Sequence, residues 1–305
     1  MKARIVEVGP RDGLQNEKQT VTTETKLELI DRLGAAGVCV IEATSFVSPK
    51  WIPQMADHDA IMRRLTRRTG VSYPVLTPNL KGFEAAADAG ATEVAVFAAA
   101  SESFSQKNIN CSIAESIARF EPVFEAAKAR GIEVRGYVSC VIACPYEGPI
   151  APQAVADVSQ ALHERGAYEV SLGDTIGVGT PASVERMLDA VATRVPVTQL
   201  AGHYHDTYGM AIANVSASWR FGVRTFDSSI SGLGGCPYAK GATGNVATED
   251  VVYLLQGLGA DTGIALDALV DTSAWISDRL GRAPNSRVTR AMLAKRATAS
   301  VAELA

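Results

Sequence analysis

Short hydrophobic runs alternate with longer amphipathic segments along most of the chain. Continuous apolar runs of this length predict parallel strands that are buried on both faces, and the amphipathic segments predict the helices that cover them. The predicted strands are Arg4–Val8, Val38–Ala43, Val71–Leu76, Glu93–Ala98, Glu133–Val141, Tyr168–Leu172, Thr198–His203 and Thr225–Ile230. The predicted helices between them are roughly Thr23–Ala36, Gln54–Arg68, Leu80–Ala89, Ile113–Arg130, Pro152–Arg165, Pro181–Thr193 and Tyr208–Phe221.

Glycine follows most of the predicted helices, as is usual where a helix ends in a left-handed residue. The glycines in this position are Gly37, Gly70, Gly90, Gly131, Gly166 and Gly222. Repeated units of a strand and a helix, with eight strands in all, predict an α/β protein whose sheet closes into a (β/α)8 TIM barrel. An open, doubly wound sheet is the alternative, but no G-x-G-x-x-G motif follows the first strand to support it.

Further helices are predicted after the eighth strand, at Thr248–Leu258, Leu266–Leu280 and Val288–Leu304. The last two exceed what a barrel of eight units needs. We therefore predict a catalytic barrel domain over residues 1–262 and a C-terminal helical extension over residues 263–305. The extension is expected to cover the barrel or a partner subunit, in a homo-oligomer that is a dimer or a tetramer.

The composition limits the partners and the compartment. The chain has 305 residues, of which 47% are hydrophobic and 20% charged, and its formal net charge is −4. The interspersed charges give no basic face for nucleic acid, and no apolar run is long enough to span a membrane. Five cysteines, an odd number in a chain of this size, and a first segment without signal-peptide features predict a reducing, cytoplasmic location.

The most informative stretch is Leu200–Tyr208, which reads LAGHYHDTY and contains two of the four histidines. Alternate residues of a strand point to the same face, so His203 and His205 can present two imidazoles to one point while Tyr204 turns away. Neutral imidazole is a common ligand of divalent metals. A strand end with two incidental polar side chains is the alternative interpretation.

Polar residues also follow several other predicted strands. These residues are Arg11, Asp12, Glu42, Asp174, Asn245 and Glu249, together with the glycine-rich stretch that contains Cys236. In a TIM barrel the working site lies at the carboxyl ends of the strands, so closure of the barrel is expected to bring these side chains to one rim.

Asp12 is the natural third ligand beside His203 and His205. One carboxylate, two imidazoles and further oxygen ligands, such as the Asn245 amide and water, suit Mg²⁺ or Mn²⁺ better than tetrahedral Zn²⁺. A two-histidine-one-carboxylate iron site has the same ligands and remains open. Asp12 also precedes a glycine, and Asp-Gly is equally typical of a turn.

Arg11 and Cys236 have two interpretations each. Arg11 is either a fixed cation aimed at an oxyanion of the substrate or a salt-bridge partner of Glu42 or Asp174. The glycines around Cys236 predict a mobile flap with a thiol at its tip, and the alternative is that Cys236 is a small buried residue. The loop has a Gly-to-Lys spacing like that of a phosphate loop, but no Gly-Lys-Ser/Thr follows, which disfavours a nucleotide site.

Taken together, these segments resemble the 3-hydroxy-3-methylglutaryl-CoA (HMG-CoA) lyases, within a larger group of metal-dependent barrel lyases and Claisen-condensing enzymes. The matching segments are VGPRDGLQNEK (8–18), EATSFVSPKWIPQMAD (42–57), NINCSIAES (108–116), CPYEG (144–148), SLGDTIGVGTP (171–181), HYHDTYG (203–209) and GLGGCPYAKGATGNVATED (232–250). The larger group shares the Arg-Asp pair and the His-x-His motif. The cysteine-bearing loop narrows the match to the lyases.

The resemblance implies roles for the candidate residues. The metal ligands would be Asp12, His203, His205 and Asn245. Arg11 would bind the substrate and stabilise the enolate of the departing acetyl-CoA, and Cys236 would be the catalytic cysteine of the flap. The supporting or proton-handling residues would be Glu42, Asp174 and Glu249. Mammalian members use a cysteine near the C-terminus in a regulatory disulfide; no cysteine follows Cys236 here, so we predict no such switch.

The implied activity is divalent-metal-dependent cleavage of HMG-CoA to acetyl-CoA and acetoacetate, in leucine or ketone-body metabolism. This reaction needs a base for the tertiary hydroxyl, stabilisation of the thioester enolate, and a proton donor to the enolate carbon. The base would be His203 or a carboxylate. The proton donor would be Cys236 or a bound water.

Alternative activities remain open at this point. Tyr204, Met210 and Ile230-Ser231 differ from the residues common in the family, which leaves room for a longer 3-hydroxy-3-alkylglutaryl-CoA such as 3-hydroxy-3-isohexenylglutaryl-CoA. A Claisen-condensing transferase acting on a 2-oxo acid is a second alternative, but those enzymes usually carry an additional C-terminal regulatory domain. A non-catalytic metal- or CoA-binding barrel is the third.

Overall fold

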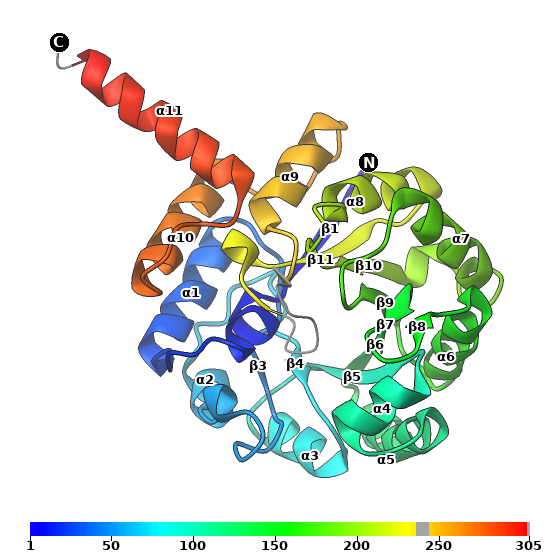
Figure 1. Cartoon of the computed structure of the whole chain (residues 1–305). Helices are drawn as coiled ribbons and strands as arrows, with labels where there is room; N and C mark the ends of the chain where they lie inside the picture. The colour runs from blue at the N-terminus through cyan, green and yellow to red at the C-terminus, as the bar shows by residue number, and fades with distance from the viewer. Residues whose placement is uncertain (236–243, 304–305) are drawn as a thin grey trace.

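The computed structural model describes residues 1–235 and 244–303 and contains a ring of parallel strands surrounded by helices (Figure 1). The strands of the ring are β1 (Arg4–Glu7), β2 (Val40–Ile41), β3 (Thr44–Ser45), β4 (Val75–Leu76), β5 (Glu93–Ala99), β6 (Glu133–Ser139), β9 (Glu169–Asp174), β10 (Leu200–Tyr204) and β11 (Thr225–Ser228). Their order is β2-β1-β11-β10-β9-β6-β5-β4-β3, so the sheet begins and ends on neighbouring pieces of the same stretch of chain. The predicted TIM barrel is confirmed.

The second predicted strand, Val38–Ala43, is divided into β2 and β3 in the structure. Its pairing continues across the division, because Ile41 donates to the Ser72 carbonyl and Ala43 donates to the Pro74 carbonyl. Pro74 has no N–H, so the bond that it would return to this strand is missing. The proline in the neighbouring strand therefore explains why the regular pairing stops between β2 and β3.

Each predicted helix of the barrel is present, and one or both ends are shifted in every one except α5. The helices are α1 (Thr23–Ala35), α2 (His58–Arg64), α3 (Leu80–Asp88), α5 (Ile113–Arg130), α6 (Pro152–Glu164), α7 (Pro181–Ala192) and α8 (Ala211–Phe221). Helix α5 has the predicted bounds because both ends carry strong signals: a capping box between Ser112 and Glu115, and a left-handed glycine, Gly131. Helix α4 (Glu102–Ile109) and a hairpin of β7 (Ala143–Cys144) and β8 (Gly148–Pro149) were not predicted.

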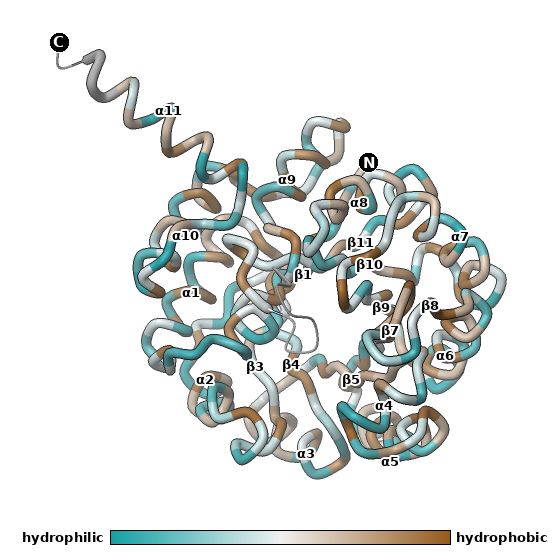
Figure 2. Tube along the Cα trace, in the orientation of Figure 1, coloured by the Kyte–Doolittle hydropathy of each residue, from teal (hydrophilic) through white to brown (hydrophobic). Residues whose placement is uncertain are grey.

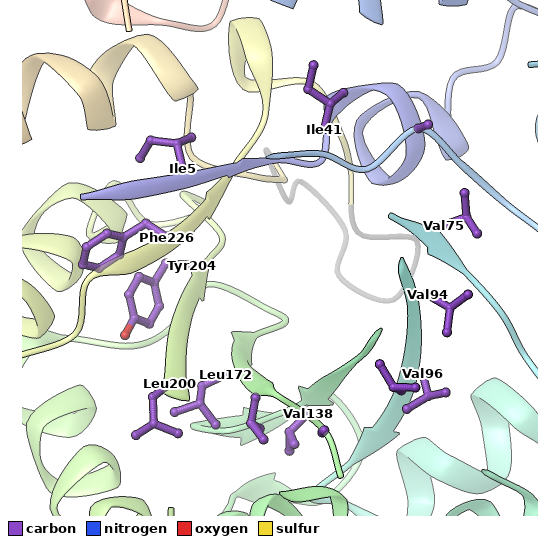
Figure 3. Packing of buried hydrophobic residues seen from close by; sticks show 14 of the residues in the cluster. Ile5, Ile41, Val75, Val94, Val96, Val138, Leu172, Leu200, Tyr204 and Phe226 are labelled. Atoms are coloured by element: carbon purple, nitrogen blue, oxygen red, sulfur yellow. The ribbon is translucent and has the colours of Figure 1, made fainter. Parts of the chain in front are cut away.

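The main hydrophobic core lies between the ring of strands and the surrounding helices. Figure 3 shows residues of this core, among them Ile5, Val94, Leu172 and Phe226, on the strands of the ring, and these four are at most 1% exposed. Hydrophobic and hydrophilic positions alternate within the peripheral helices, as expected for helices with one face on a sheet (Figure 2). Burial of this apolar surface is the main stabilising contribution.

The strand residues that alternate with these core residues point to the other face of the sheet, into the barrel, and they include a buried group of charged side chains. Arg135 on β6, Glu169 on β9 and Asp227 on β11 are each at most 1% exposed. Arg135 forms salt bridges to both carboxylates, at 2.8 Å and 2.7 Å. This polar group lies next to the candidate site, because Asp227 also contacts His203 at 3.1 Å.

Three helices follow the last strand: α9 (Thr248–Gly257), α10 (Leu266–Arg279) and α11 (Arg287–Glu303). The segment before α10 joins the barrel closely, because Ala265 donates to the Ala36 carbonyl at 2.9 Å. Arg296 of α11 pairs with Asp267 and Asp271 of α10, and α11 projects away from the ring in Figure 1. The domain boundary at residue 262 stays a prediction. None of the described helices combines the length and the apolar character needed to cross a membrane.

Candidate metal centre and active site

The turn after β1 places Arg11 and Asp12 at the carboxyl end of the barrel. Residues Gly9–Gly13 form a wide helical turn, in which Gly13 donates to the Val8 carbonyl at 3.1 Å. A side chain at Gly9 would have its Cβ only 2.5 Å from a carboxylate oxygen of Glu7, so this close approach requires glycine. Contacts within the protein therefore fix the shape of this turn without a ligand.

His203 and His205 point to the same place, as the strand periodicity predicted. Their Nε2 atoms lie 3.4 Å apart, and both residues are at most 9% exposed. Tyr204 turns outward, and its hydroxyl lies 2.7 Å from that of Ser218 on α8. Tyr204, one of the departures from the family pattern, is thus directed away from the site.

Asp12 lies beside the two histidines, although it is far from them in the sequence. Ligand atoms of Asp12, His203 and His205 all lie within 4.8 Å of one another. Asn245 donates to the Asp12 carboxylate at 2.7 Å and forms an isolated β-bridge with His205. The four sequence-predicted ligands are therefore brought together. One carboxylate and two imidazoles, with an amide beside them, fit a divalent cation.

The electrostatics of the cluster favour a cation. Burial alone would raise the pKa of Asp12, but Arg11, His203 and His205 lower it to about 2. Burial and the neighbouring His203 lower the pKa of His205 to about 4. Asp12 is thus ionised and His205 neutral at pH 7, which are the protonation states that metal ligation requires. Burial alone would lower the pKa of His203, but Asp227 and Asp12 raise it.

The structure shows the predicted salt bridge of Arg11 to Glu42, and the role of Arg11 toward an oxyanion stays a prediction. Its Nε donates to Glu42 at 2.7 Å, and a terminal nitrogen donates to Asp12 at 2.8 Å. Glu42 is fully buried and also accepts from the Tyr137 hydroxyl at 3.3 Å. The salt bridge to Glu42 therefore holds the guanidinium in place, while Arg11 also lines the cavity.

A cavity of about 670 Å³ opens at this end of the barrel. Its lining includes Arg11, Asp12 and both candidate histidine ligands, and, elsewhere in the same cavity, Trp51, Lys107 and Arg119. A cavity of this volume accommodates a substantial organic ligand. The cationic groups fit an anionic ligand, and the cluster of Asp12, His203 and His205 would hold a divalent cation beside it.

None of the three predicted supporting residues is among those that line this cavity, and Glu42 contacts it through Arg11. Asp174 accepts from the Gly179 N–H at 2.7 Å, and burial raises its pKa to about 6. Glu249 accepts from Ser231 and from Thr289, and burial raises its pKa to about 6 as well. These contacts brace the loops around the site, and proton handling by either residue stays a prediction. Cys236 lies outside the described residues.

Sequence reasoning missed several residues that support the site. Glu7 accepts from Gly9, Ile230 and Thr248 and so joins the ends of two strands to α9. Arg135, Tyr137 and Asp227 form contacts inside the barrel that depend on the register between strands. The available signal was the presence of charged residues within otherwise apolar strands, which is unusual unless the charges are paired.

Comparison with known proteins identifies the group to which these features belong. A model of the HMGL-like family matches residues 2–276. The chain belongs to the HMGL-like family. A mitochondrial hydroxymethylglutaryl-CoA lyase of Bos taurus is 60% identical over 290 residues, which cover 95% of this chain and 89% of that protein.

Bacterial members of the HMGL-like family are equally similar. A Pseudomonas aeruginosa protein named 3-hydroxy-3-isohexenylglutaryl-CoA/hydroxy-methylglutaryl-CoA lyase is 58% identical over 294 residues, covering 96% of this chain and 98% of that protein. The crystal structure of a hydroxymethylglutaryl-CoA lyase from Pseudomonas aeruginosa superposes with a TM-score of 0.95 at 58% identity, over 96% of this chain and 98% of the other. The resemblance inferred from the sequence motifs is confirmed at the level of the family and of the fold.

Proposed function

We propose that this protein is a divalent-metal-dependent carbon–carbon lyase that cleaves HMG-CoA to acetyl-CoA and acetoacetate. The observation that carries the proposal is that Asp12, His203, His205 and Arg11 lie together at one cavity. The chain is also 60% identical to a protein named hydroxymethylglutaryl-CoA lyase. The reaction needs a cation binding site and a fixed positive charge in a concave, buried setting. These residues supply both.

Asp12, His203 and His205 would hold Mg²⁺ or Mn²⁺, with Asn245 as a fourth ligand. When bound, the ion would act as a Lewis acid that orients the substrate and lowers the pKa of its tertiary hydroxyl. Arg11, which Glu42 fixes at 2.7 Å, would stabilise the enolate oxygen that develops on the thioester. The proton acceptor would be a carboxylate, because the two ring nitrogens of His203 face Asp227 and the metal site, and Cys236 or a water would protonate the enolate carbon.

Acetoacetate release tests the proposal directly. The purified protein is incubated with Mg²⁺ and HMG-CoA, and the acetoacetate and acetyl-CoA released are measured. We expect the two products in equal amounts. The proposal fails if folded, metal-loaded protein releases neither product. Asp12→Ala is expected to lose metal binding and turnover, whereas Cys236→Ala is expected to keep metal binding and lose turnover.

A longer substrate is the second candidate, because a relative of 58% identity carries the isohexenyl substrate in its name. Measuring kcat/KM for HMG-CoA and for 3-hydroxy-3-isohexenylglutaryl-CoA on one preparation separates the two. A higher value for the isohexenyl compound would reassign the physiological substrate while keeping the reaction. A role in leucine degradation, a homo-oligomeric state and a cytoplasmic location remain predictions from the sequence.

A further inference from the structure

A buried carboxylate contacts the ring nitrogen of His203 that faces away from the candidate metal. Asp227 lies directly opposite His203 in the parallel pairing of β10 and β11. Its Oδ2 is 3.1 Å from Nδ1 of His203, while Nε2 of His203 faces Nε2 of His205 at 3.4 Å. One nitrogen of the ring is thus occupied by a carboxylate and the other is left for the cation.

Arg135 and Ser171 hold Asp227 in a single orientation. The two terminal nitrogens of Arg135 donate to the two oxygens of Asp227 at 3.1 Å and 2.7 Å, and the Ser171 hydroxyl donates at 2.6 Å. Three donor groups thus point at the two oxygens of Asp227, and two of them belong to a guanidinium, so the side chain is a carboxylate. A carboxylate only accepts hydrogen bonds, so Nδ1 of His203 carries the proton.

Arg135 is itself fixed from the other side. Its Nε donates to Glu169 at 2.8 Å, and Glu169 also pairs with Arg4. Arg135 lies over the Tyr137 ring, with 5.0 Å from its guanidinium carbon to the ring centre. The interior of the barrel therefore contains a continuous chain of contacts from Glu169 through Arg135 and Asp227 to His203.

A purely structural role is the alternative explanation for this chain of contacts. A buried ion pair seldom stabilises a protein more than apolar residues of the same size would, so stability alone is a weak reason to place charges there. The two histidines also differ: His205 contacts the backbone of Thr175, whereas Nδ1 of His203 contacts a carboxylate. Within the described residues, a carboxylate directs the Nδ1 side of His203 and not that of His205.

We propose that Asp227, held in place by Arg135, is a positioning residue of the metal centre. It fixes the ring orientation of His203 and keeps the proton on Nδ1, so that the Nε2 lone pair points at the cation. Carboxylates that direct a ligating histidine in this way typically contribute 10–100-fold, as an order of magnitude, to metal affinity or activity. This inference rests on the metal centre of the proposed function.

Mn²⁺ affinity tests the positioning role without relying on turnover. The variant Asp227→Asn keeps the size of the side chain but replaces the anionic carboxylate, which only accepts hydrogen bonds, with a neutral amide that also donates them. We expect its Kd for Mn²⁺, measured from the electron paramagnetic resonance signal of free Mn²⁺, to rise about 10–100-fold. The KM for the thioester at saturating Mn²⁺ is expected to stay within about threefold, because the residue acts through the metal.

Glu169→Gln is the matched control, because it removes a carboxylate from the same buried network on the far side of Arg135. Its Kd for Mn²⁺ is expected to stay within about threefold of the wild-type value, because Glu169 does not contact a metal ligand. Asp227→Asn is expected to lose more Mn²⁺ affinity than this. A wild-type Kd in Asp227→Asn, or an equal loss in both variants, would overturn the positioning role. Failure of the wild-type protein to bind Mn²⁺ would instead overturn the metal centre itself.

The wild-type protein gives a second test if Asp227→Asn does not fold. The chain contains four histidines, so nitrogen-15 spectra of histidine-labelled, Mg²⁺-loaded protein can be assigned with single His→Gln variants. We expect the proton of His203 on Nδ1 and none on Nε2. A proton on Nε2 of His203, with Nδ1 unprotonated, would contradict the proposal.

Discussion

At the scale of single residues, Arg11 shows how a charged side chain becomes a fixed part of a site. Arg11 is 7% exposed, and its guanidinium bonds to Glu42 and Asp12. Burial alone would lower its pKa, but the two carboxylates raise it above its ordinary value. Arg11 is therefore a permanent cation whose direction is set before the substrate arrives, which is the condition for efficient stabilisation of a developing anion.

Replacing Arg11 by methionine should separate this role from metal binding. We expect kcat to fall by about 10²–10³, the usual effect of removing one preorganised donor from an oxyanion. Kd for Mn²⁺ is expected to change by less than the effect on kcat, because the ligands remain. Steady-state kinetics and Mn²⁺ titration on the same preparation measure the two quantities. A variant that kept full turnover would show that Arg11 only neutralises Glu42.

At the scale of elements, the agreement between prediction and structure follows the strength of local signals. Helix α5 has a capping box and a C-terminal glycine, and its bounds were predicted correctly. Helix α4, with the sequence ESFSQKNI, was missed because it is short and mostly polar. Helix α8 begins at Ala211, after the predicted Tyr208, because Gly209 has a φ of +73° and the Asp206 carboxylate accepts from Ala211.

Glu7 shows how one side chain connects several elements. Its carboxylate accepts from Gly9, Ile230 and Thr248, and it is fully buried. Burial raises its pKa from 4.5 to about 8. Between these two values the folded state holds a proton that the unfolded state has lost, so the contribution of Glu7 to stability falls as the pH rises.

The variant Glu7→Gln should remove this pH dependence. The free energy of unfolding, from urea titrations, is measured for both proteins between pH 5 and pH 8. We expect the difference between wild type and variant to decline as the pH rises across this window, towards the folded-state pKa of about 8. The exposed Glu133→Gln controls for loss of a carboxyl group, and parallel curves for wild type and Glu7→Gln would contradict the expectation.

At the scale of the whole molecule, the sequence predicted which residues meet but not how they are held. Asp12, His203, His205 and Asn245 were expected together because barrel closure gathers the ends of strands. The contact of Asp227 with His203 depends on the register of β10 against β11, which no local pattern specifies. The division of the second strand likewise depends on Pro74 in a neighbouring strand.

The contact between the barrel and the C-terminal segment provides a test of packing at this scale. A Cβ at Gly37 would lie 2.3 Å from the Gly263 carbonyl oxygen, whereas one at Gly70 would meet nothing within 4 Å. Both glycines have positive φ, +98° and +80°, so each change to alanine costs about 1–2 kcal/mol of backbone strain. We expect Gly37→Ala to lose about 1–3 kcal/mol more in urea titrations because of the clash. Equal losses of unfolding free energy in the two variants would show that the segment around Gly263 moves away from the new Cβ at no measurable cost.

The central proposal is that Asp12, after β1, and the two histidines at the end of β10 hold a single cation. Crystals grown with Mn²⁺ and measured at the manganese absorption edge locate that ion by its anomalous scattering. We expect one strong peak within coordination distance of the Asp12 carboxylate and of Nε2 of both His203 and His205. An ion bound elsewhere, or no peak among these three residues in Mn²⁺-saturated crystals, would contradict the account.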